Sequence, residues 1–281
     1  MNFSVIIPCQ TKTDLCPELL PALKAQTLKP KEILIIPDSI CPGGPAAKRD
    51  FAARKAVGSV LAFIDSDAYP DKNWLQNSLR QLKSTAVAAV CGPGLTPPTD
   101  SPRQKISGLV WSNFLGAGPY TYRNHPTKAR FVDDYPTFNF IVKKSAFQQV
   151  HGFKTHFWPG EDTKLCHDLT QKLHKKILYH PEILVYHHRR PVFLPHLQQI
   201  SRYGFQRGRF VRLFPRTSFR ISYFLPLLLP IFFPLYFPAL ILTAIYHRSL
   251  LLAPAIFLTH LTYAVNFYKG FSFVKNYPSE S

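Results

Sequence analysis

The chain has 281 residues, enough for one globular domain of ordinary size with some length to spare. Lys and Arg total 34 against 16 acidic residues, a formal net charge of +18, which suggests an anionic partner such as nucleic acid, lipid headgroups or a phosphorylated substrate. No zinc-finger or RNA-binding aromatic motif occurs, so we expect no nucleic-acid partner. The five cysteines form no Cys-x-x-Cys pair, which argues against a disulfide framework and a zinc site.

The first third of the chain alternates apolar strands with helical segments. Short β-branched, apolar runs predict buried strands at Phe3–Pro8, Glu32–Pro37 and Ser59–Ile64. Helices are predicted between them, at Leu19–Leu28, where the proline lies near the helix start, and at Ala46–Gly58, which is rich in good helix formers. This alternation indicates right-handed crossovers and an α/β fold with a mostly parallel central sheet.

The pattern continues with an interruption. A helix is predicted at Trp74–Lys83 and a strand at Ala86–Cys91. The segment Thr96–Asp134 has weak periodicity and many Pro, Gly and Tyr residues, which predicts loops that cover the site. A closing strand is predicted at Ile177–Tyr186. Because ligands bind beyond the carboxyl ends of the strands in such sheets, the residues that follow each strand are candidates for binding.

Two carboxylates, Asp65 and Asp67, flank Ser66 where the third apolar strand ends. Oxygen ligands suit a hard divalent cation, Mg²⁺ or Mn²⁺, which can bridge the two phosphates of a nucleotide diphosphate. Asp-x-Asp is also common in solvated turns, and the triplet alone leaves that alternative open. The wholly apolar strand before it and the aromatic residues after it favour the metal site.

Several weak motifs occur in a fixed order along the chain. They are the segments Phe3–Pro8, Glu32–Ile36, Ala47–Arg49, Ala62–Asp67, Asn139 with Val142–Ser145, Gly152–Phe153 and Gly160–Cys166. Together they resemble a family 2 glycosyltransferase of the GT-A type, over roughly residues 1–216. The resemblance implies a Rossmann-like GT-A domain, a nucleotide-diphosphate sugar as donor and a divalent metal as cofactor.

The resemblance assigns donor binding to residues that lie far apart in the sequence. These are Pro8, Gln10, Asp38, Arg49, Asp65 and Asn139. The segment from Pro8 to Gln10 would pack around the nucleobase. Pro37 stands where the family has the first of two acidic residues, so Asp38 contacts the nucleotide or is only a turn residue. Arg49 matches a basic residue aimed at the donor, since a guanidinium suits phosphate oxygens; a solvated helix face is its alternative.

Glu161 and Asp162 resemble the family's Glu-Asp pair. A sugar transfer that inverts the anomeric centre needs a carboxylate to take the proton from the acceptor hydroxyl, and Asp162 is predicted as this base. Glu161 would shape the acceptor site or interact with the helix end, where acidic residues also complement the helix dipole. The resemblance places a metal-binding histidine after the closing strand. We select His188, with His187 as the alternative, since neighbouring strand residues face opposite sides; a basic cluster on the surface is the other interpretation of these residues.

Two uncharged apolar runs, Ile221–Tyr246 and Leu250–Tyr268, follow the glycosyltransferase-like region. Each is about long enough to cross a hydrocarbon core of ~30 Å. We therefore expect a membrane hairpin, in which the proline-rich first run spans with kinks or is re-entrant. Arginines crowd into a basic segment at about residues 196–220, where anionic lipid headgroups would bind them. By the positive-inside rule both ends of the hairpin are cytoplasmic.

The sequence thus predicts a GT-A domain at residues 1–215, two membrane segments within 221–268 and a cytoplasmic tail at 269–281, located at the inner (plasma) membrane with the catalytic domain in the cytoplasm. The predicted function is metal-dependent transfer of a sugar from a nucleotide-diphosphate sugar to a hydroxyl of a lipid-linked or cell-surface glycan. One alternative is a processive polysaccharide synthase, because Gln206–Phe210 resembles the Gln-x-x-Arg-Trp motif. The other is a non-catalytic membrane scaffold that retains the fold.

Overall fold

The structure is a computed structural model that describes residues 1–153 and 159–273. The chain divides into two compact units. Unit 1 consists of Met1–Pro98 and Tyr122–His188, and unit 2 consists of Thr99–Thr121 and Arg189–Ser281. These divisions differ from the predicted boundary near residue 215, because the arginine-rich segment folds together with the apolar helices that follow it. Most of the predicted tail at 269–281 lies outside the described residues.

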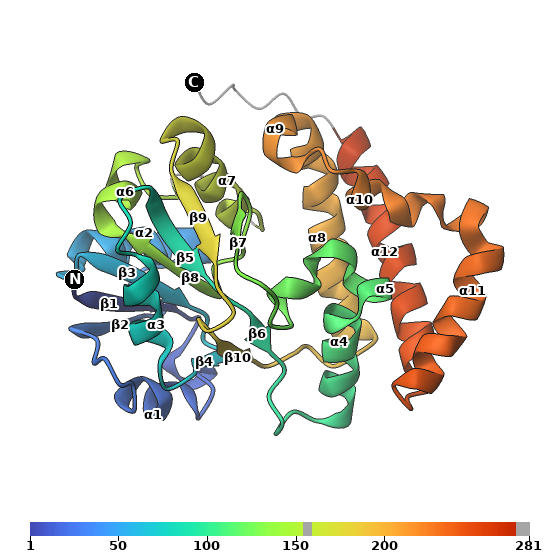
Figure 1. Cartoon of the computed structure of the whole chain (residues 1–281), viewed down its shortest axis with the longest axis horizontal. Coiled ribbons are helices and arrows are strands. Elements are labelled where there is room, and N and C mark those ends of the chain that lie inside the picture. Colours follow the sequence, from blue (N-terminus) through green and yellow to red (C-terminus); the bar gives the residue numbers. More distant parts are fainter. Residues whose placement is uncertain (154–158, 274–281) are drawn as a thin grey trace. The chain divides into compact units, whose positions relative to one another are not determined.

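Unit 1 is built on a seven-stranded sheet in the order β2-β1-β3-β8-β5-β9-β7 (Figure 1). The strands are β1 Phe3–Pro8, β2 Glu32–Ile36, β3 Val60–Ile64, β5 Val87–Cys91, β7 Arg130–Val132, β8 Asn139–Lys143 and β9 Lys176–Tyr179. β1 pairs in parallel with β2 and β3, and β5 with β9. β8 is antiparallel to both β3 and β5, and β7 is antiparallel to β9. The sheet is therefore mixed rather than mostly parallel, because a fully buried strand has the same apolar pattern in either direction.

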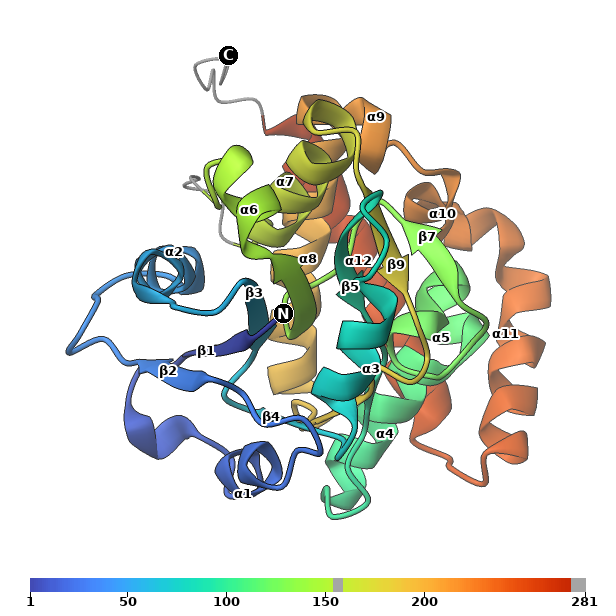
Figure 2. The same ribbon diagram turned by 60° about the vertical axis from the view of Figure 1, so that its left-hand side comes forward.

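The first three strands position the residues of interest. Every residue of β1 and of β3 is buried, and β2, β1 and β3 lie side by side (Figure 2). Since the three strands are parallel, the residues that follow Pro8, Ile36 and Ile64 meet at one edge of the sheet.

A second, three-stranded sheet consists of β4 Ala68–Pro70, β10 Val185–His187 and β6 Gly94–Leu95, in the order β4-β10-β6. The predicted closing strand Ile177–Tyr186 is thus wrong, because it is divided between β9 of the large sheet and β10 of the small one. A turn separates the two strands, in which the Ile183 amide donates to the His180 carbonyl oxygen.

Along the described residues of unit 1, α-helices alternate with these strands. They are α1 Leu19–Lys24, α2 Pro45–Lys55, α3 Trp74–Gln81, α6 Lys144–Gln149 and α7 Glu161–His167, the last continuing into a π-helical turn at Asp168–Lys172. The three helices predicted in the first third are confirmed, each ending earlier than expected. Pro45 occupies the first turn of α2, where its missing N–H costs no helical hydrogen bond.

Unit 2 is helical. Its helices are α4 Pro102–Ser112, α5 Phe114–Ala117, α8 Leu194–Leu213, α9 Pro215–Ser218, α10 Ile221–Phe224, α11 Leu229–Tyr246 and α12 Leu252–Ser272. The predicted loop at Thr96–Asp134 is therefore wrong in its middle part. A capping box starts α4 there, in which Ser101 Oγ accepts from the Gln104 amide and the Gln104 side chain accepts from the Ser101 amide.

Helices α8 and α12 pack closely along their lengths (Figure 1). A Cβ at Gly208 would lie 2.1 Å from the Phe267 carbonyl oxygen, and a Cβ at Gly270 would lie 1.9 Å from the Phe205 carbonyl oxygen. Only glycine permits this approach of the two backbones. The predicted basic interfacial segment therefore contains a packed helix, whose buried residues include Gly208 and Phe210.

The two predicted membrane segments correspond to α10–α11 and α12. Among the residues that the structure describes, no single helix has both the length and the apolar composition for a membrane span. The bent pair Ile221–Leu228 and Ile231–Tyr246, with an angle of 92° between its parts, meets both conditions only when taken together. The predicted hairpin is therefore not confirmed.

Candidate functional site

The turn that follows β3 carries the two predicted metal ligands. β3 is buried along its whole length, so the chain emerges from the core at Asp65. The Ala68 amide donates to the Asp65 carbonyl oxygen at 3.2 Å and closes the turn. Two backbone amides from other segments hold it, because Cys16 N donates to Ser66 O at 2.8 Å and His188 N donates to Asp67 O at 2.9 Å. The carboxylates are thus presented on a turn that is fixed from both sides.

The structure brings Asp65 and Asp67 together with His187. One ligand atom from each of the three residues lies within 4.8 Å of the other two, and His187 Nε2 is 3.1 Å from Asp67 Oδ1. The His187 ring stacks on Phe138 with 4.9 Å between the ring centroids, which orients the imidazole. The structure places the alternative His187, and not the predicted His188, with Asp65 and Asp67. β10 pairs with β4 so that His187 lies opposite Ala68, and His188 Nε2 instead lies 3.4 Å from Glu18 Oε2.

These three residues fit a hard divalent cation. Two carboxylates and one imidazole form an oxygen-rich donor set of the kind that Mg²⁺ and Mn²⁺ accept. All three side chains are partly buried, so the site is open to a ligand on one side. The stacking on Phe138 holds the imidazole of His187 beside Asp67 without using its Nε2 atom.

Arg49 of α2 links this cluster to α7. Its Nη2 donates to Asp65 Oδ1 at 2.7 Å, and its Nη1 donates to Glu161 Oε1 at 3.1 Å. The residue is only 3 % exposed, and its guanidinium lies 5.7 Å from the centroid of the Phe153 ring. The alternative of a solvated helix face is therefore wrong for Arg49. Its contact with a donor stays a prediction, because the structure shows hydrogen bonds from its guanidinium to the carboxylates of Asp65 and Glu161.

Glu161 and Asp162 begin α7 and differ in their surroundings. Glu161 is buried, and its second oxygen accepts from the Gly160 amide at 3.0 Å, so both carboxylate oxygens are used within the fold. Gly160 has a φ of 124°, which favours glycine at this position. Asp162 is partly buried, and its Oδ1 accepts from the Thr163 amide at 2.8 Å. Of the pair, Asp162 is the more exposed residue, whereas Glu161 orients Arg49.

The ends of β1 and β2 form the side of the site where the resemblance places the nucleotide. Pro8 is buried at the end of β1, and Gln10 and Asp38 are exposed. The Asp38 amide donates to the Gln10 carbonyl oxygen at 2.9 Å, which joins the two strand ends. Lys48 of α2 is buried, and its Nζ lies 2.6 Å from both Asp38 Oδ1 and the Cys9 carbonyl oxygen. Asp38 is therefore part of an ion pair and more than a solvated turn residue.

Asn139 does not face this site. It is completely buried in β8, opposite Ile64 of β3. Its amide nitrogen donates to the Gly92 and Ile183 carbonyl oxygens at 2.6 and 2.7 Å, and its oxygen accepts from Trp74 Nε1 at 2.8 Å. The hydrogen-bonding groups of the amide are thus used within the core, where Asn139 joins α3 to the segments that follow β5 and precede β10; its contact with a donor stays a prediction that this placement does not support.

The carboxylate–histidine cluster at the end of a parallel strand, with a Glu-Asp pair linked to it by an arginine, matches what the sequence resemblance implies. The family model described as "Glycosyl transferase family group 2" matches residues 60–269. The chain belongs to this family. This match confirms the prediction that the chain is a family 2 glycosyltransferase, and hence an enzyme.

Individual relatives of this glycosyltransferase are more distant. A pre-mycofactocin glycosyltransferase of Mycobacterium tuberculosis is 28 % identical over 163 residues, which are 57 % of this chain and 33 % of the relative. The aligned part thus spans about a third of that protein's length. A mannosyltransferase from Pyrobaculum calidifontis, solved in complex with GDP-Man and Mn²⁺, superposes with a TM-score of 0.56 at 16 % identity, covering 95 % of this chain and 84 % of that one. The likeness confirms the α/β fold of GT-A type.

Sequence reasoning missed Lys48 and ranked His187 second. Lys48 was passed over beside Arg49, although a lysine next to the matched arginine on a helix that follows a strand end was a usable signal. His187 was named only as the alternative. The pattern His187-His188 could not distinguish the two, because the choice depends on the register of β10 against β4.

Proposed function

We propose that the protein transfers a sugar from a nucleotide-diphosphate sugar to a hydroxyl group, using Mg²⁺ or Mn²⁺ held by Asp65, Asp67 and His187. The observation that carries the proposal is the juxtaposition of these three ligands at the carboxyl end of β3. Family membership supports a glycosyltransferase, and a relative of the same fold was solved with GDP-Man and Mn²⁺. When bound, the ion would neutralise the charge of the departing nucleotide diphosphate.

We assign the roles of the protein residues from their contacts and from the family resemblance. Asp162 accepts the proton of the acceptor hydroxyl as that oxygen displaces the nucleotide diphosphate from the opposite face of the anomeric carbon, and this single displacement inverts the anomeric centre. Arg49 positions the Asp65 carboxylate and, through Glu161, the start of α7, so that the metal-binding turn and the base keep a fixed geometry. The ion pair of Asp38 and Lys48 lies at the strand ends where the nucleotide would bind.

We propose a lipid-linked or cell-surface glycan as the acceptor and the cytoplasmic face of the inner (plasma) membrane as the location. The support is the composition of α11, which contains no charged residue. Its exposed side chains are apolar or aromatic: Ile231, Phe232, Phe233, Leu235, Phe237, Ile241, Leu242, Ile245 and Tyr246. An apolar helix surface of this size favours insertion into a lipid interface, and Arg212 and Arg216, which are exposed in the same unit, suit anionic headgroups.

The proposal is tested by measuring donor hydrolysis and donor binding across a set of nucleotide sugars, with and without Mn²⁺. We expect one donor to be hydrolysed only in the presence of the ion, and Asp67→Asn to abolish this hydrolysis. Asp71→Asn, which changes a nearby carboxylate outside the cluster, should leave it intact. If no nucleotide diphosphate binds in the presence of Mn²⁺, the protein is a scaffold. If a suitable acceptor yields a ladder of products, the protein is a processive synthase.

A further inference from the structure

A second group of metal-ligand side chains lies beside the turn that carries Asp67. It consists of Cys16, Glu18 and His188, and one ligand atom of each lies within 4.8 Å of the other two. His188 Nε2 is 3.4 Å from Glu18 Oε2. Cys16 and Glu18 precede α1, whereas His188 follows β10, so the group joins segments about 170 residues apart in the sequence (188 against 18). This distance explains why no cysteine–histidine spacing reveals the group in the sequence.

The backbone holds two members of the group in place. The amides of Cys16 and His188 are the donors that fix the Ser66 and Asp67 carbonyl oxygens. Cys16 Sγ lies 3.6 Å from the carbonyl oxygen of Ala68, the residue that directly follows Asp67. The backbone that carries the Cys16 and His188 side chains is therefore held by the same turn that presents Asp67.

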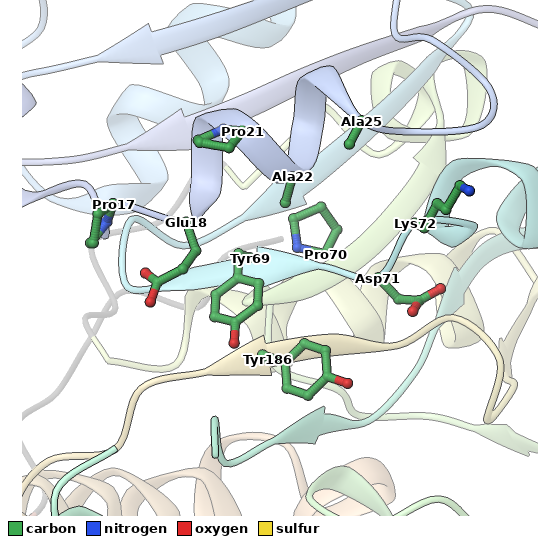
Figure 3. Close-up of a pocket in the computed structure, with 10 residues that line it drawn as sticks. All are labelled: Pro17, Glu18, Pro21, Ala22, Ala25, Tyr69, Pro70, Asp71, Lys72 and Tyr186. Atoms are coloured by element: carbon green, nitrogen blue, oxygen red, sulfur yellow. The ribbon is translucent and has the colours of Figure 1, made fainter. Parts of the chain in front are cut away.

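One member of the group, Glu18, lies at a hollow that is open to solvent. Glu18 lines a hollow of about 630 Å³ together with Tyr69 and Tyr186, whose rings stack with 5.0 Å between centroids. Figure 3 shows Glu18 near the start of α1, with Tyr69 and Tyr186 lining the same hollow. The side chains of Glu18 and His188 are 34 % and 21 % exposed, whereas the two facing atoms, Glu18 Oε2 and His188 Nε2, are themselves buried.

We propose that Cys16, Glu18 and His188 form a second metal site, which binds a borderline-soft divalent ion of the Zn²⁺ type and is separate from the Asp65–Asp67–His187 site. Sulfur, nitrogen and oxygen ligands in one group are the donor set that Zn²⁺ accepts. Three protein ligands with solvent in the fourth position match sites in which Zn²⁺ keeps an open coordination position. The ion displaces the thiol proton on binding, so one proton is released and the thiolate coordinates.

The two sites differ in the metal they prefer, and backbone hydrogen bonds connect them. The cluster at Asp65 has no sulfur ligand and suits Mg²⁺ or Mn²⁺, whereas the thiolate selects the softer ion. Because Cys16 and His188 hold the carbonyl groups of Ser66 and Asp67, an ion on their side chains stabilises the turn that presents Asp67. An ion in the second site thus stabilises the first site through the backbone, although the two sites share no ligand.

Cobalt titration of the full chain, without nucleotide, tests the proposal. Co²⁺ replaces Zn²⁺ in such sites and gives a thiolate-to-cobalt charge-transfer absorption that a carboxylate–histidine site cannot give. We expect one such ion per chain, displaced by one equivalent of Zn²⁺. Cys16→Ser should remove the absorption, and Glu18→Gln should weaken binding more than about tenfold, since even outer-shell changes cost about 10–100-fold in metal affinity. Cys41→Ser and Asp67→Asn should retain the absorption.

Several results would overturn the proposal. They are the absence of the absorption in the unaltered protein, its persistence in Cys16→Ser, and its loss in Cys41→Ser. Unchanged affinity in Glu18→Gln would also overturn it, and this variant alters a partly exposed side chain, so the test does not depend on the folding of Cys16→Ser. Retention of the absorption in Asp67→Asn separates this site from the proposed donor site, whose failure would show in donor hydrolysis alone.

Discussion

Arg49→Met is the substitution with the most specific expected effect. Arg49 is 3 % exposed and is the cation that lies between Glu161 and Asp65. Removing one partner of a buried ion pair leaves an uncompensated charge and costs about 3–5 kcal/mol. The Glu161 side chain is 9 % exposed, so that cost applies to it. The Asp65 side chain is 33 % exposed and stays hydrated without Arg49. The loss of the Arg49–Asp65 ion pair therefore adds only about 0–1 kcal/mol to the destabilisation.

Urea unfolding measures this effect, and a double-mutant cycle assigns it to the pair. We expect Arg49→Met to lower the free energy of unfolding by about 3–5 kcal/mol. Arg49→Met with Glu161→Gln should lose less than the sum of the two single changes by at least about 1 kcal/mol, because the second change removes the charge left unpaired by the first. Arg54→Met, at an exposed position of the same helix, should stay within about 0.5 kcal/mol. Additive losses, or a loss below about 1 kcal/mol in Arg49→Met, would refute the reasoning.

Three further outcomes are expected. Asp162→Asn should lower the rate of sugar transfer by about 10²–10⁴-fold, the range of a general base, while calorimetry shows unchanged donor binding; full activity would exclude Asp162 as the base. His187→Gln should weaken Mn²⁺ binding and His188→Gln should not, and the reverse order would reassign the ligand. Burial lowers the pKa of His196 to about 4 from an ordinary value of 6.5. Between pH 4 and pH 6.5 this histidine is therefore protonated in the unfolded chain and neutral in the folded protein. Stability should therefore fall as pH drops from 6.5 to 4, by up to about 1.4 kcal/mol per pH unit. His196→Asn should flatten this dependence in urea midpoints, and an unchanged slope would contradict the assignment.

The sequence determined the parts of the molecule that depend on local pattern. The apolar runs of β1 and β3 are buried throughout, as their composition predicts, and a polar turn that directly follows a buried strand has to emerge at the sheet edge. Asp65 and Asp67 were therefore predictable from a few adjacent residues. The order of weak motifs was enough to identify the family, because their spacing reflects one sequence of strands and helices.

Only the tertiary structure decided which distant side chains meet. The register of β10 against β4 selects His187 for the Asp65 cluster and sends His188 to Glu18, and a shift by one residue would exchange them. Arg49 and Glu161 pair across 112 residues, and the Asn139 side chain points into the core. Neither contact can be predicted from the local pattern of apolar and polar residues. The apolar runs after residue 220 show the same limit. An apolar run has one composition whether it packs on another helix, as α12 does on α8, or faces lipid, so its surroundings cannot be read from composition and follow from packing alone.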